Sequence, residues 1–432
     1  MVIVGLGQTA VGATAVAAPE TADHFPDWNE PIPLTTVVNA PFGASRPVVA
    51  AAPSGPTVTV VFNRQMSNDL FDNDPWFTRS INNGATWSPP TSIFSGTANS
   101  QQPTVVIDVA NRAHAAWREG TALVYAAEED WGSNRIQFLS VPLDPPGVTT
   151  PAIAAGASGV LAIVWAEGSG GNPDIHFTRS GDGGQSWEMS RPVLTTPSSS
   201  LFPDVVVDAN NVLHLVWEEN DKVGEPGQPV QGTVYYSHST AMGWSEPVSL
   251  SDIKGMADAH RPTILLTNQG VEVAFVGQGA GVTTVHHVYC NGLCDSGLSW
   301  QTTPPVSAGF TYQSDIPIIP TLGRYQGCAL VYIHGVRTDI PAEMSGLWGS
   351  SRCGSWQQQE RQILPPDQAL APQLVNQGSQ WSYLTYESVG ITNQIMFLRN
   401  QFKMFLPYVG CAIDAPPDVG CGALVPLGLE QR

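Results

Sequence analysis

Arginines and carboxylates are the residues of this sequence whose chemistry best suits a ligand site lined by mixed charge. A guanidinium group presents a fork of N–H donors that matches a carboxylate. The candidate binding residues are Arg46, Arg64, Glu119, Glu167, Glu219, Arg261 and Arg337. They are spread widely along the chain, so only a fold that returns repeatedly to one centre could bring them together.

A repeated phrase indicates such a fold. The stretch "RSGDGGQSW" ends at Trp187, and "RSINNGATW" carries the same phrase one hundred residues earlier, ending at Trp87. "CDSGLSW" ends at Trp300 and keeps the Asp, Gly, Ser and Trp, while shorter versions end at Trp244 and Trp356. The tryptophans from Trp187 to Trp356 are 57, 56 and 56 residues apart. A period near fifty residues is typical of a repeat architecture.

The phrase itself predicts a tight turn at the tip of a hairpin. Asp182 provides a side-chain acceptor, and Gly183 and Gly184 permit the backbone angles that a tight reversal needs. The residues that we expect to shape these turns are Ser80, Asn82, Gly84, Trp87, Ser180, Asp182, Gly184, Trp187, Asp295, Gly297 and Trp300.

A second marker supports the same repeat. Each unit begins with a proline followed by an apolar, β-branched run, and an aromatic residue stands about fourteen positions later. The prolines are Pro47, Pro103, Pro151, Pro203, Pro262, Pro317 and Pro372. The aromatic residues are Phe62, Trp117, Trp165, Trp217, Phe275, Tyr332 and Tyr386. This order predicts four short strands per unit, and no helical periodicity is present.

The seventh unit ends after three strands, near Arg399, and the N-terminal segment offers the missing one. "WNEPIPL" at Trp28 matches the fourth-strand phrase "WSEPVSL" at Trp244 almost residue for residue. Pairing of this segment with the last unit would close a ring and hide its edges. We therefore predict an all-β fold, a seven-bladed β-propeller closed by an N-terminal strand. Six blades plus an irregular module is the alternative, because the second unit has no turn phrase around Trp131.

The pattern Ser-x-Asp-x-Gly-x-Thr/Ser-Trp resembles the Asp-box (BNR) repeat of sialidase-like propellers. Residues Ser180 to Trp187 fit it at every defined position, and the repeat pattern covers the chain from Trp28 to about Arg399. The resemblance implies that the box is a structural turn between the third and fourth strands, away from the substrate face. It identifies a fold and not a chemistry.

Composition predicts an exported protein with three regions. The chain has 18 basic and 37 acidic residues and a formal net charge of −19, which argues against nucleic-acid binding. Residues 1–24 resemble a secretion signal or a flexible segment, 25–400 form the propeller, and 401–432 form a cysteine-containing tail. No stretch is long and apolar enough to span a bilayer. We expect an extracellular or cell-surface location.

Six cysteines lie in the last third of the chain, and an even count in an exported protein suggests disulfides. Proximity in sequence favours Cys290–Cys294, Cys328–Cys353 and Cys411–Cys421, although fifteen pairings exist for six cysteines. No CxxC pair or nearby histidine cluster supports a zinc site. We expect no metal and no cofactor.

The ligand site is expected on the face of the ring where the first strands begin, because arginines and carboxylates from different blades would converge there. The resemblance to sialidases implies three arginines that hold a carboxylated sugar, a Tyr–Glu pair matched by Tyr386 and Glu387, and an acid matched by Asp72 or Asp74. The family's opening arginine motif is incomplete around Arg46. Most of these acids also recur at equivalent repeat positions, as duplication alone would produce.

These departures favour non-catalytic binding of a glycan or another surface ligand in the central cleft. A sialidase-type glycoside hydrolase or a polysaccharide lyase using the same cleft is the first alternative. A structural module of a cell-surface complex is the second. The geometry of the cleft discriminates between them, whereas the ligand and the oligomeric state are not predicted.

Overall fold

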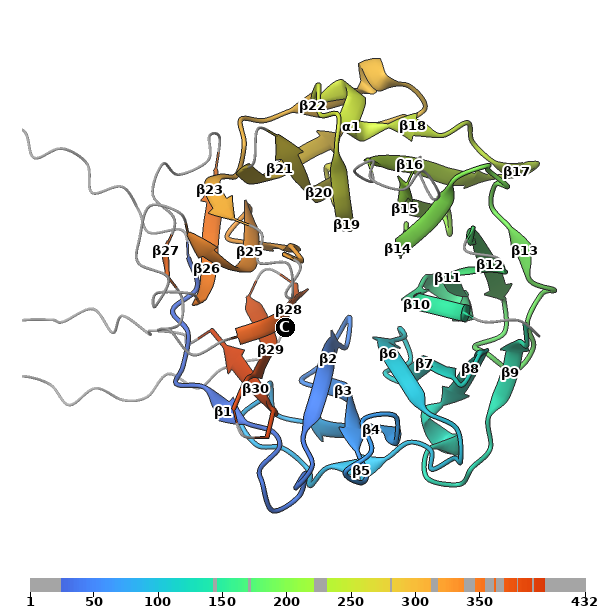
Figure 1. Cartoon of the computed structure of the whole chain (residues 1–432), viewed down its shortest axis with the longest axis vertical. Coiled ribbons are helices and arrows are strands. Elements are labelled where there is room, and N and C mark those ends of the chain that lie inside the picture. The colour runs from blue at the N-terminus through green and yellow to red at the C-terminus, as the bar shows by residue number, and fades with distance from the viewer. Residues whose placement is uncertain are drawn as a thin grey trace, which may run out of the picture. The chain divides into compact units, whose positions relative to one another are not determined.

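Seven antiparallel sheets follow one another in the computed structural model of the chain. It describes residues 25–142, 146–169, 172–220, 231–279, 282–311, 318–337, 346–353, 361–362, 369–378, 380–390 and 392–400. We number the sheets as blades 1 to 7 in chain order (Figure 1).

Each blade places its strands in sequence order from the ring axis outwards. The first strands are β2 (Ala44–Ala51), β6 (Ser100–Ile107), β10 (Pro146–Ala155), β14 (Ser199–Val207), β19 (Ala259–Thr267), β24 (Thr321–Tyr325) and β28 (Ala369–Gln377). The second strands are β3 (Val58–Gln65), β7 (Ala113–Glu119), β11 (Leu161–Ser169), β15 (Leu213–Asn220), β20 (Gly270–Gly279), β25 (Cys328–Arg337) and β29 (Trp381–Ser388). The third strands are β4 (Asn73–Ser80), β8 (Ala122–Ala127), β12 (Asp174–Ser180), β16 (Gly232–Thr240), β21 (Val282–Cys290), β26 (Gly346–Arg352) and β30 (Gln394–Arg399).

The outermost strands are shorter and less regular. They are β1 (Ile32–Pro33), β5 (Thr91–Ser92), β9 (Gln137–Ser140), β13 (Arg191–Pro192), β17 (Gly243–Trp244), β18 (Val248–Ser249), β22 (Trp300–Thr302), β23 (Ser307–Thr311) and β27 (Arg361–Gln362). The short helical segments are α1 (Leu250–Ile253) and the 3-10 turns η1 (Glu128–Asp130), η2 (Ala157–Gly159) and η3 (Gly297–Ser299).

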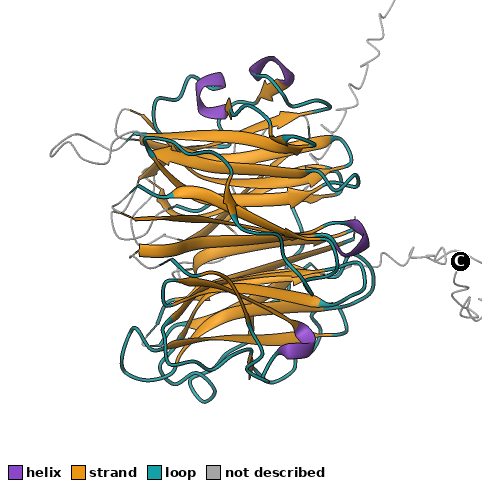
Figure 2. Cartoon of the chain, turned by 90° about the vertical axis from the view of Figure 1, so that its right-hand side faces the viewer, coloured by secondary structure: helices purple, strands orange, loops and turns teal. Residues whose placement is uncertain are grey.

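The seven first strands form a closed ring around the axis. Each first strand contacts the first strand of the next blade, and β28 contacts β2. Seen from the edge of the ring, the strands run from one face to the other (Figure 2). We call the face where the first strands begin, and where the loops between second and third strands project, the upper face. The opposite face, with the loops between first and second strands, is the lower face.

Closure by the N-terminal strand is confirmed. Strand β1 pairs with β30, with Ile32 opposite Phe397, and Trp28 bridges to Asn400. The backbone N–H of Asn29 donates to the carbonyl of Arg399 at 3.0 Å. Blade 7 therefore takes three strands from the end of the described chain and one from its beginning, and the six-bladed alternative is wrong.

Two places depart from the regular repeat. In blade 2, the turn around Trp131 is built on η1, which explains the missing sequence phrase. Between blades 5 and 6, β23 pairs with both β21 and β25, so one continuous sheet joins the two blades.

The predicted second-strand aromatics form the centre of the packing between blades. Trp117, Trp165, Trp217, Tyr332, Phe62 and Phe275 are among the largest fully or almost fully buried side chains, and Tyr386 is 4% exposed. Each sheet packs between two neighbours, so apolar residues are needed on both of its faces. This explains why the second strands read as continuous apolar runs.

The turns that end in Trp87 and Trp187 share one hydrogen-bond pattern. In the second turn, the hydroxyl of Ser180 accepts from the N–H of Gly184 at 2.9 Å, and Asp182 accepts from the N–H of Ser186 at 2.9 Å. Hydrogen bonds, the first of them from the Ser186 hydroxyl, lower the pKa of Asp182 to about 2. Ser80 and Asn82 occupy the matching roles in the first turn.

The third turn is built differently. The short helix η3 contains Gly297, and the Trp300 indole donates to the carbonyl of Cys294 at 3.3 Å. Asp295 lies 3.3 Å from His238 of blade 4. This turn therefore depends on a disulfide and a contact between blades.

Two of the three predicted disulfides are present. Cys290 is bonded to Cys294, and Cys328 to Cys353, with Cα–Cα distances of 5.9 and 4.5 Å. Cys411 and Cys421 lie outside the described residues.

Candidate functional site

A β-bulge interrupts the first strand in six of the seven blades. The pairing register with the second strand shifts at Arg46, Gln102, Thr150, Phe202, Arg261 and Ala371, each of which precedes a proline. All six have φ between 48° and 54°, in the left-handed region. Proline has no N–H for the ladder, and a bulge accommodates it. The left-handed conformation costs a non-glycine residue roughly 1–2 kcal/mol.

The bulge residues line a single cavity on the ring axis. Its volume is about 270 Å³, and its wall combines these residues with the prolines that follow them. In blade 6 the equivalent positions are Ile319 and Pro320. The prediction that this unit starts at Pro317 was wrong, because "IPIIP" offers two successive X-Pro steps and the second one lines the cavity.

The lining combines positive charge, amide, hydroxyl and aromatic groups with one carboxyl group, that of Asp204, whose pKa burial raises. Arg46 comes from blade 1 and Arg261 from blade 5, which are not neighbours in the ring. The guanidinium of Arg261 lies 3.4 Å from the centroid of the Phe202 ring, in a cation–π arrangement. Gln102 and Thr150 add polar groups from blades 2 and 3.

Hydrogen bonds between blades hold the bulges in place. The N–H of Arg46 donates to Glu387 of blade 7 at 3.2 Å, and the N–H of Arg261 donates to Glu218 of blade 4 at 3.0 Å. The N–H of Thr150 donates to the side-chain oxygen of Gln102 at 2.8 Å. A side chain of the preceding blade thus satisfies a backbone group at three of the bulges, so the wall of the cavity is formed before any ligand binds.

A second layer of contacts between blades lies deeper in the channel wall. Asp204 accepts from the N–H of Ile264 at 3.0 Å and from the hydroxyl of Thr263 at 3.1 Å. Thr321 accepts from the N–H of Leu374 at 2.9 Å in the same way. Asp204 stands two positions after the bulge residue Phe202, and Thr321 stands two positions after Ile319. Both side chains link successive first strands.

Arg64 does not line this cavity. Arg64 places its guanidinium 4.0 Å from the centroid of the Trp76 ring, within blade 1. The side chain of Arg337 lies outside the described residues. Among the described residues, two of the four candidate arginines therefore line the cavity.

Asp72 and Asp74 differ in exposure although they are close in sequence. Asp72 is exposed in the loop before β4, whereas Asp74 is 4% exposed and accepts hydrogen bonds from Ser95 and Gly96. Burial raises the pKa of Asp74 above the usual range of a carboxyl group. Neither residue lines the axial cavity.

Each of the three repeated glutamates is held by a tryptophan of its own strand and by a serine, which for Glu167 comes from the preceding blade. The indole N–H groups of Trp117, Trp165 and Trp217 donate to Glu119, Glu167 and Glu219 at 3.1, 2.6 and 2.7 Å. Serine hydroxyls add further bonds, from Ser100, Ser140 and Ser200 respectively. Burial also raises the pKa of Glu119.

Tyr386 and Glu387 point into different surroundings because successive strand residues alternate between faces. Tyr386 belongs to the apolar cluster between blades 6 and 7. Glu387 is 7% exposed, and it accepts hydrogen bonds from the N–H of Arg46 and from the Asn393 amide. Burial raises the pKa of Glu387.

His260, next to the cavity arginine Arg261, was not predicted as a site residue. Its ring nitrogens lie 2.9 Å from Glu218 and 2.7 Å from Asp258. Burial alone would lower the pKa of His260, but the hydrogen bonds and charges of Glu218 and Asp258 outweigh it and raise the pKa. The sequence could have indicated His260 only through its position directly before the bulge residue Arg261. Nothing in the sequence distinguished its partner Glu218 from the neighbouring Glu219.

In the described part of the chain, no group of three or more His, Cys, Asp or Glu side chains is arranged to hold a metal ion. None of the described helices has the length and apolar character needed to cross a membrane.

The comparisons with known proteins establish the fold. No protein-family model matches the sequence, and no curated protein matches it. A protein of unknown function from Dyadobacter fermentans is similar in structure, at 15% identity and a TM-score of 0.52, over 87% of this chain and 100% of that one. An ulvan lyase, a polysaccharide lyase bound to -[GlcA(1-4)Rha3S]-, has 14% identity and a TM-score of 0.56, over 82% of this chain and 93% of that one.

Sialidase from Trypanosoma rangeli is also among the matches. It has 11% identity and a TM-score of 0.45, over 83% of this chain and 54% of that chain. At these identities the likeness concerns the fold and not the chemistry.

Proposed function

We propose that this chain is an exported propeller that binds acidic glycans in its axial cavity without cleaving them. The observation that carries the proposal is that Arg46 and Arg261, from blades 1 and 5, line one cavity. Two guanidinium groups in one space suit a carboxylate or sulfate group. Gln102 and Thr150 offer hydrogen-bond partners for sugar hydroxyls, and Phe202 offers an apolar surface.

The burial of the candidate catalytic residues favours binding over cleavage. A nucleophile or a general acid must reach the bond that it breaks. Tyr386 and Asp74 are each 4% exposed, and Glu387 is 7% exposed and engaged by Arg46 and Asn393. None of the three lines the cavity.

We also assign the repeats to the Asp-box type of the sialidase-like superfamily, and the protein to the cell exterior. The turns at Ser80 and Ser180 share their hydrogen bonds as well as their sequence, which supports the first assignment. Two disulfides support the second, because such bonds persist in oxidising compartments. The fold shared with an ulvan lyase makes an acidic saccharide the first ligand to test.

Calorimetric titration with uronate-containing oligosaccharides tests the proposal. The same oligosaccharides with their carboxyl groups reduced are the ligand control. Each of Arg46→Ala and Arg261→Ala should weaken binding of the acidic form roughly 10- to 100-fold, because a charge-assisted hydrogen bond contributes about 1.5–3 kcal/mol. Arg135→Ala is the matched control, since that side chain is 71% exposed and pairs with Asp130 in blade 2. It should bind like the parent protein.

Two results would contradict the proposal. Equal affinity for the acidic and the reduced oligosaccharides would show that the arginines do not recognise the acid. Release of shortened or unsaturated products that depends on Arg261 would establish a hydrolase or a lyase in the same cavity.

A further inference from the structure

A second cavity lies on the lower face, at the seam between blades 7 and 1. Its volume is about 520 Å³, within the range of roughly 300–1,000 Å³ typical of small-ligand sites. The lining consists of residues 53–56 from the loop after β2, Asn83 from the turn after β4, and Gln377, Gly378, Gln380 and Trp381 around the loop between β28 and β29. It shares no residue with the axial cavity.

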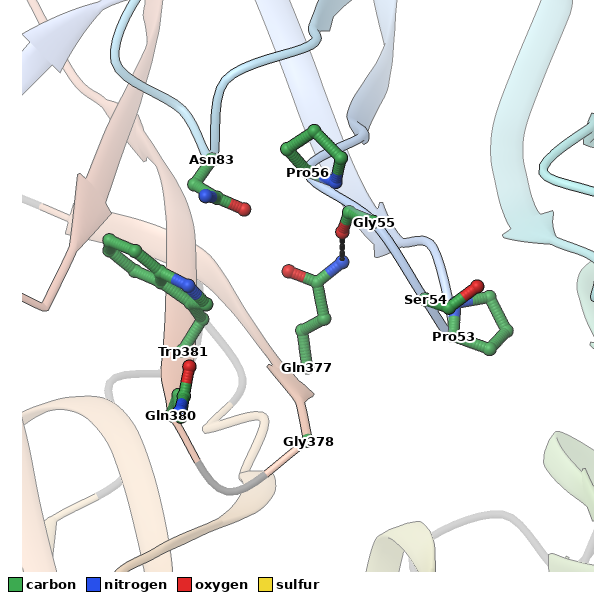
Figure 3. Close-up of a pocket in the computed structure, with 9 residues that line it drawn as sticks. All are labelled: Pro53, Ser54, Gly55, Pro56, Asn83, Gln377, Gly378, Gln380 and Trp381. Carbon is green, nitrogen blue, oxygen red and sulfur yellow. Dashed lines mark hydrogen bonds between the residues drawn. The ribbon is translucent and has the colours of Figure 1, made fainter. Parts of the chain in front are cut away.

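The framework of this cavity is rigid. The side-chain amide of Gln377 donates to the carbonyls of Ala52 and Gly55, and its oxygen accepts from the hydroxyl of Tyr383 at 2.9 Å. Figure 3 shows Gln377 reaching from β28 to Gly55, with Trp381 and Asn83 on one side of it and Pro56 near Gly55. Two prolines in the segment 53–56 restrict its backbone further.

Trp381 departs from the repeat at this position. It stands five positions before Tyr386, the buried aromatic of its second strand, and the residues at that spacing in the other blades are Thr57, Arg112, Val160, Val212, Gly270 and Gly327. None of these is a large aromatic residue, whereas Trp381 is partly buried and lines the cavity. Duplication explains residues that recur, so a large aromatic residue found in one blade needs another explanation.

Asn83 also departs from the repeat. Gly183 stands at the equivalent place in the turn of blade 3, and both residues have positive φ. The backbone of Asn83 is fixed by its N–H bond to Pro56 and by the Arg399 guanidinium, which donates to its carbonyl at 3.0 Å. Its side-chain amide therefore stands at a fixed place beside the indole of Trp381 (Figure 3).

We infer that this seam cavity binds an uncharged oligosaccharide. An indole ring offers an apolar face to the C–H groups of a sugar ring, and amide and hydroxyl side chains pair with its hydroxyl groups. Asn83, Gln380 and Ser54 supply those polar groups. No residue that lines the cavity carries a charge. The nearby Arg399 guanidinium is already engaged by the Asn83 carbonyl and lies 5.8 Å from the centroid of the Trp381 ring, so the lining itself suits sugar hydroxyls better than an acidic group. The chain thus has a neutral site on the lower face in addition to the axial site.

Fluorine NMR of protein labelled with fluorotryptophan tests this inference directly. The chain has 13 tryptophans, and the signal missing from Trp381→Leu identifies Trp381. The probes are cello-, laminari-, manno- and xylo-oligosaccharides, added one class at a time. At least one class should shift the Trp381 signal in proportion to its occupancy, because its ring would stack against that indole.

Matched variants separate this site from folding defects and from the axial cavity. Trp381→Leu keeps an apolar residue where blades 3 and 4 have valine, and Asn83→Gly installs the residue of blade 3, so both should fold. Each should lower the affinity for the neutral sugar at least tenfold. Trp244→Leu, at a partly buried tryptophan of another blade, should leave that affinity unchanged, and so should Arg261→Ala.

Three results would overturn the inference. The Trp381 signal could stay in place with every probe, or Trp381→Leu could bind the neutral sugar as tightly as the parent. Alternatively, Arg261→Ala could abolish neutral-sugar binding, which would place that binding in the axial cavity. Loss of acidic-glycan binding in Arg261→Ala tests the proposed function separately.

Discussion

At the tip of the turn that ends in Trp187, the backbone of Gly184 lies against the hydroxyl group of Tyr125 in blade 2. Tyr125 is fully buried, and its hydroxyl is 2.7 Å from Nδ1 of His114. A Cβ atom on Gly184 would overlap the Tyr125 hydroxyl. The turn is therefore a packing element between two blades as well as a chain reversal.

This contact predicts a large loss of stability for Gly184→Ala. Gly184 has a φ of +86°, which alone costs alanine about 1 kcal/mol. Displacing a buried, hydrogen-bonded tyrosine adds roughly 1–3 kcal/mol. Gly55→Ala is the matched control, because Gly55 has the same φ of +86° and no atom within 4 Å of the added Cβ. Urea unfolding should show a loss of about 3 kcal/mol for Gly184→Ala and about 1 kcal/mol for Gly55→Ala, and equal losses would mean that only the backbone angle matters.

The repeated glutamates show what sequence spacing could have revealed about single residues. Glu119, Glu167 and Glu219 each stand two positions after a tryptophan. Residues two apart on a strand share a face, so the spacing already allowed each indole to donate to its glutamate. These acids recur at one position of the repeat, near the end of the second strand, and were therefore predicted to face a central ligand site. In the structure each side chain instead accepts a hydrogen bond from the tryptophan of its own strand.

At the scale of the strands, the sequence predicted the repeat but not every register. The proline and aromatic markers located six of the seven first-strand starts and all seven buried aromatics. The sixth start was misplaced at Pro317, because two X-Pro steps follow each other and sequence alone does not decide which one precedes the strand and lines the cavity. The left-handed conformation of the residues before proline could not be predicted either. A residue before proline normally prefers an extended conformation, and the bulge imposes the exception.

The two disulfides predict unequal contributions to stability. Cys290–Cys294 closes a loop with a sequence separation of 4, whereas Cys328–Cys353 spans 25 residues across β25 and β26. Constraint of the unfolded chain grows with loop length, which gives about 2 kcal/mol for the short loop and about 3.5 kcal/mol for the long one. Urea unfolding of the double variants Cys290→Ala/Cys294→Ala and Cys328→Ala/Cys353→Ala should follow this order. A larger loss for the first pair would mean that the η3 turn depends on its disulfide more than loop entropy explains.

At the scale of the whole molecule, stability depends on joining the two ends of the described chain. Blade 7 is complete only when β1 pairs with β30. Phe25 and Leu34, on either side of the pairing segment, are each 5% exposed and belong to the apolar clusters on the two sides of this blade. The sequence predicted this closure because the segment that begins at Trp28 closely matches the fourth-strand sequence that begins at Trp244. It did not predict the seam cavity beside it, which is formed by residues that depart from the repeat.

If strand pairing rather than chain order closes the ring, residues 25–35 should stabilise blade 7 equally well when they are attached after residue 400. Trp28 bridges to Asn400, and Asn29 bonds to Arg399, so a short flexible linker can join residue 400 to residue 25 as a hairpin. A chain that runs from residue 36 to 400, through the linker, into residues 25–35 should match the urea midpoint of the 25–400 chain in native order. A chain of residues 36–400 should lose several kcal/mol or aggregate, because it exposes the edge of β30 and the apolar surface that Leu34 covers. If the permuted chain were as unstable as the shortened one, the stability of blade 7 would depend on the native chain order and not on β1 pairing alone.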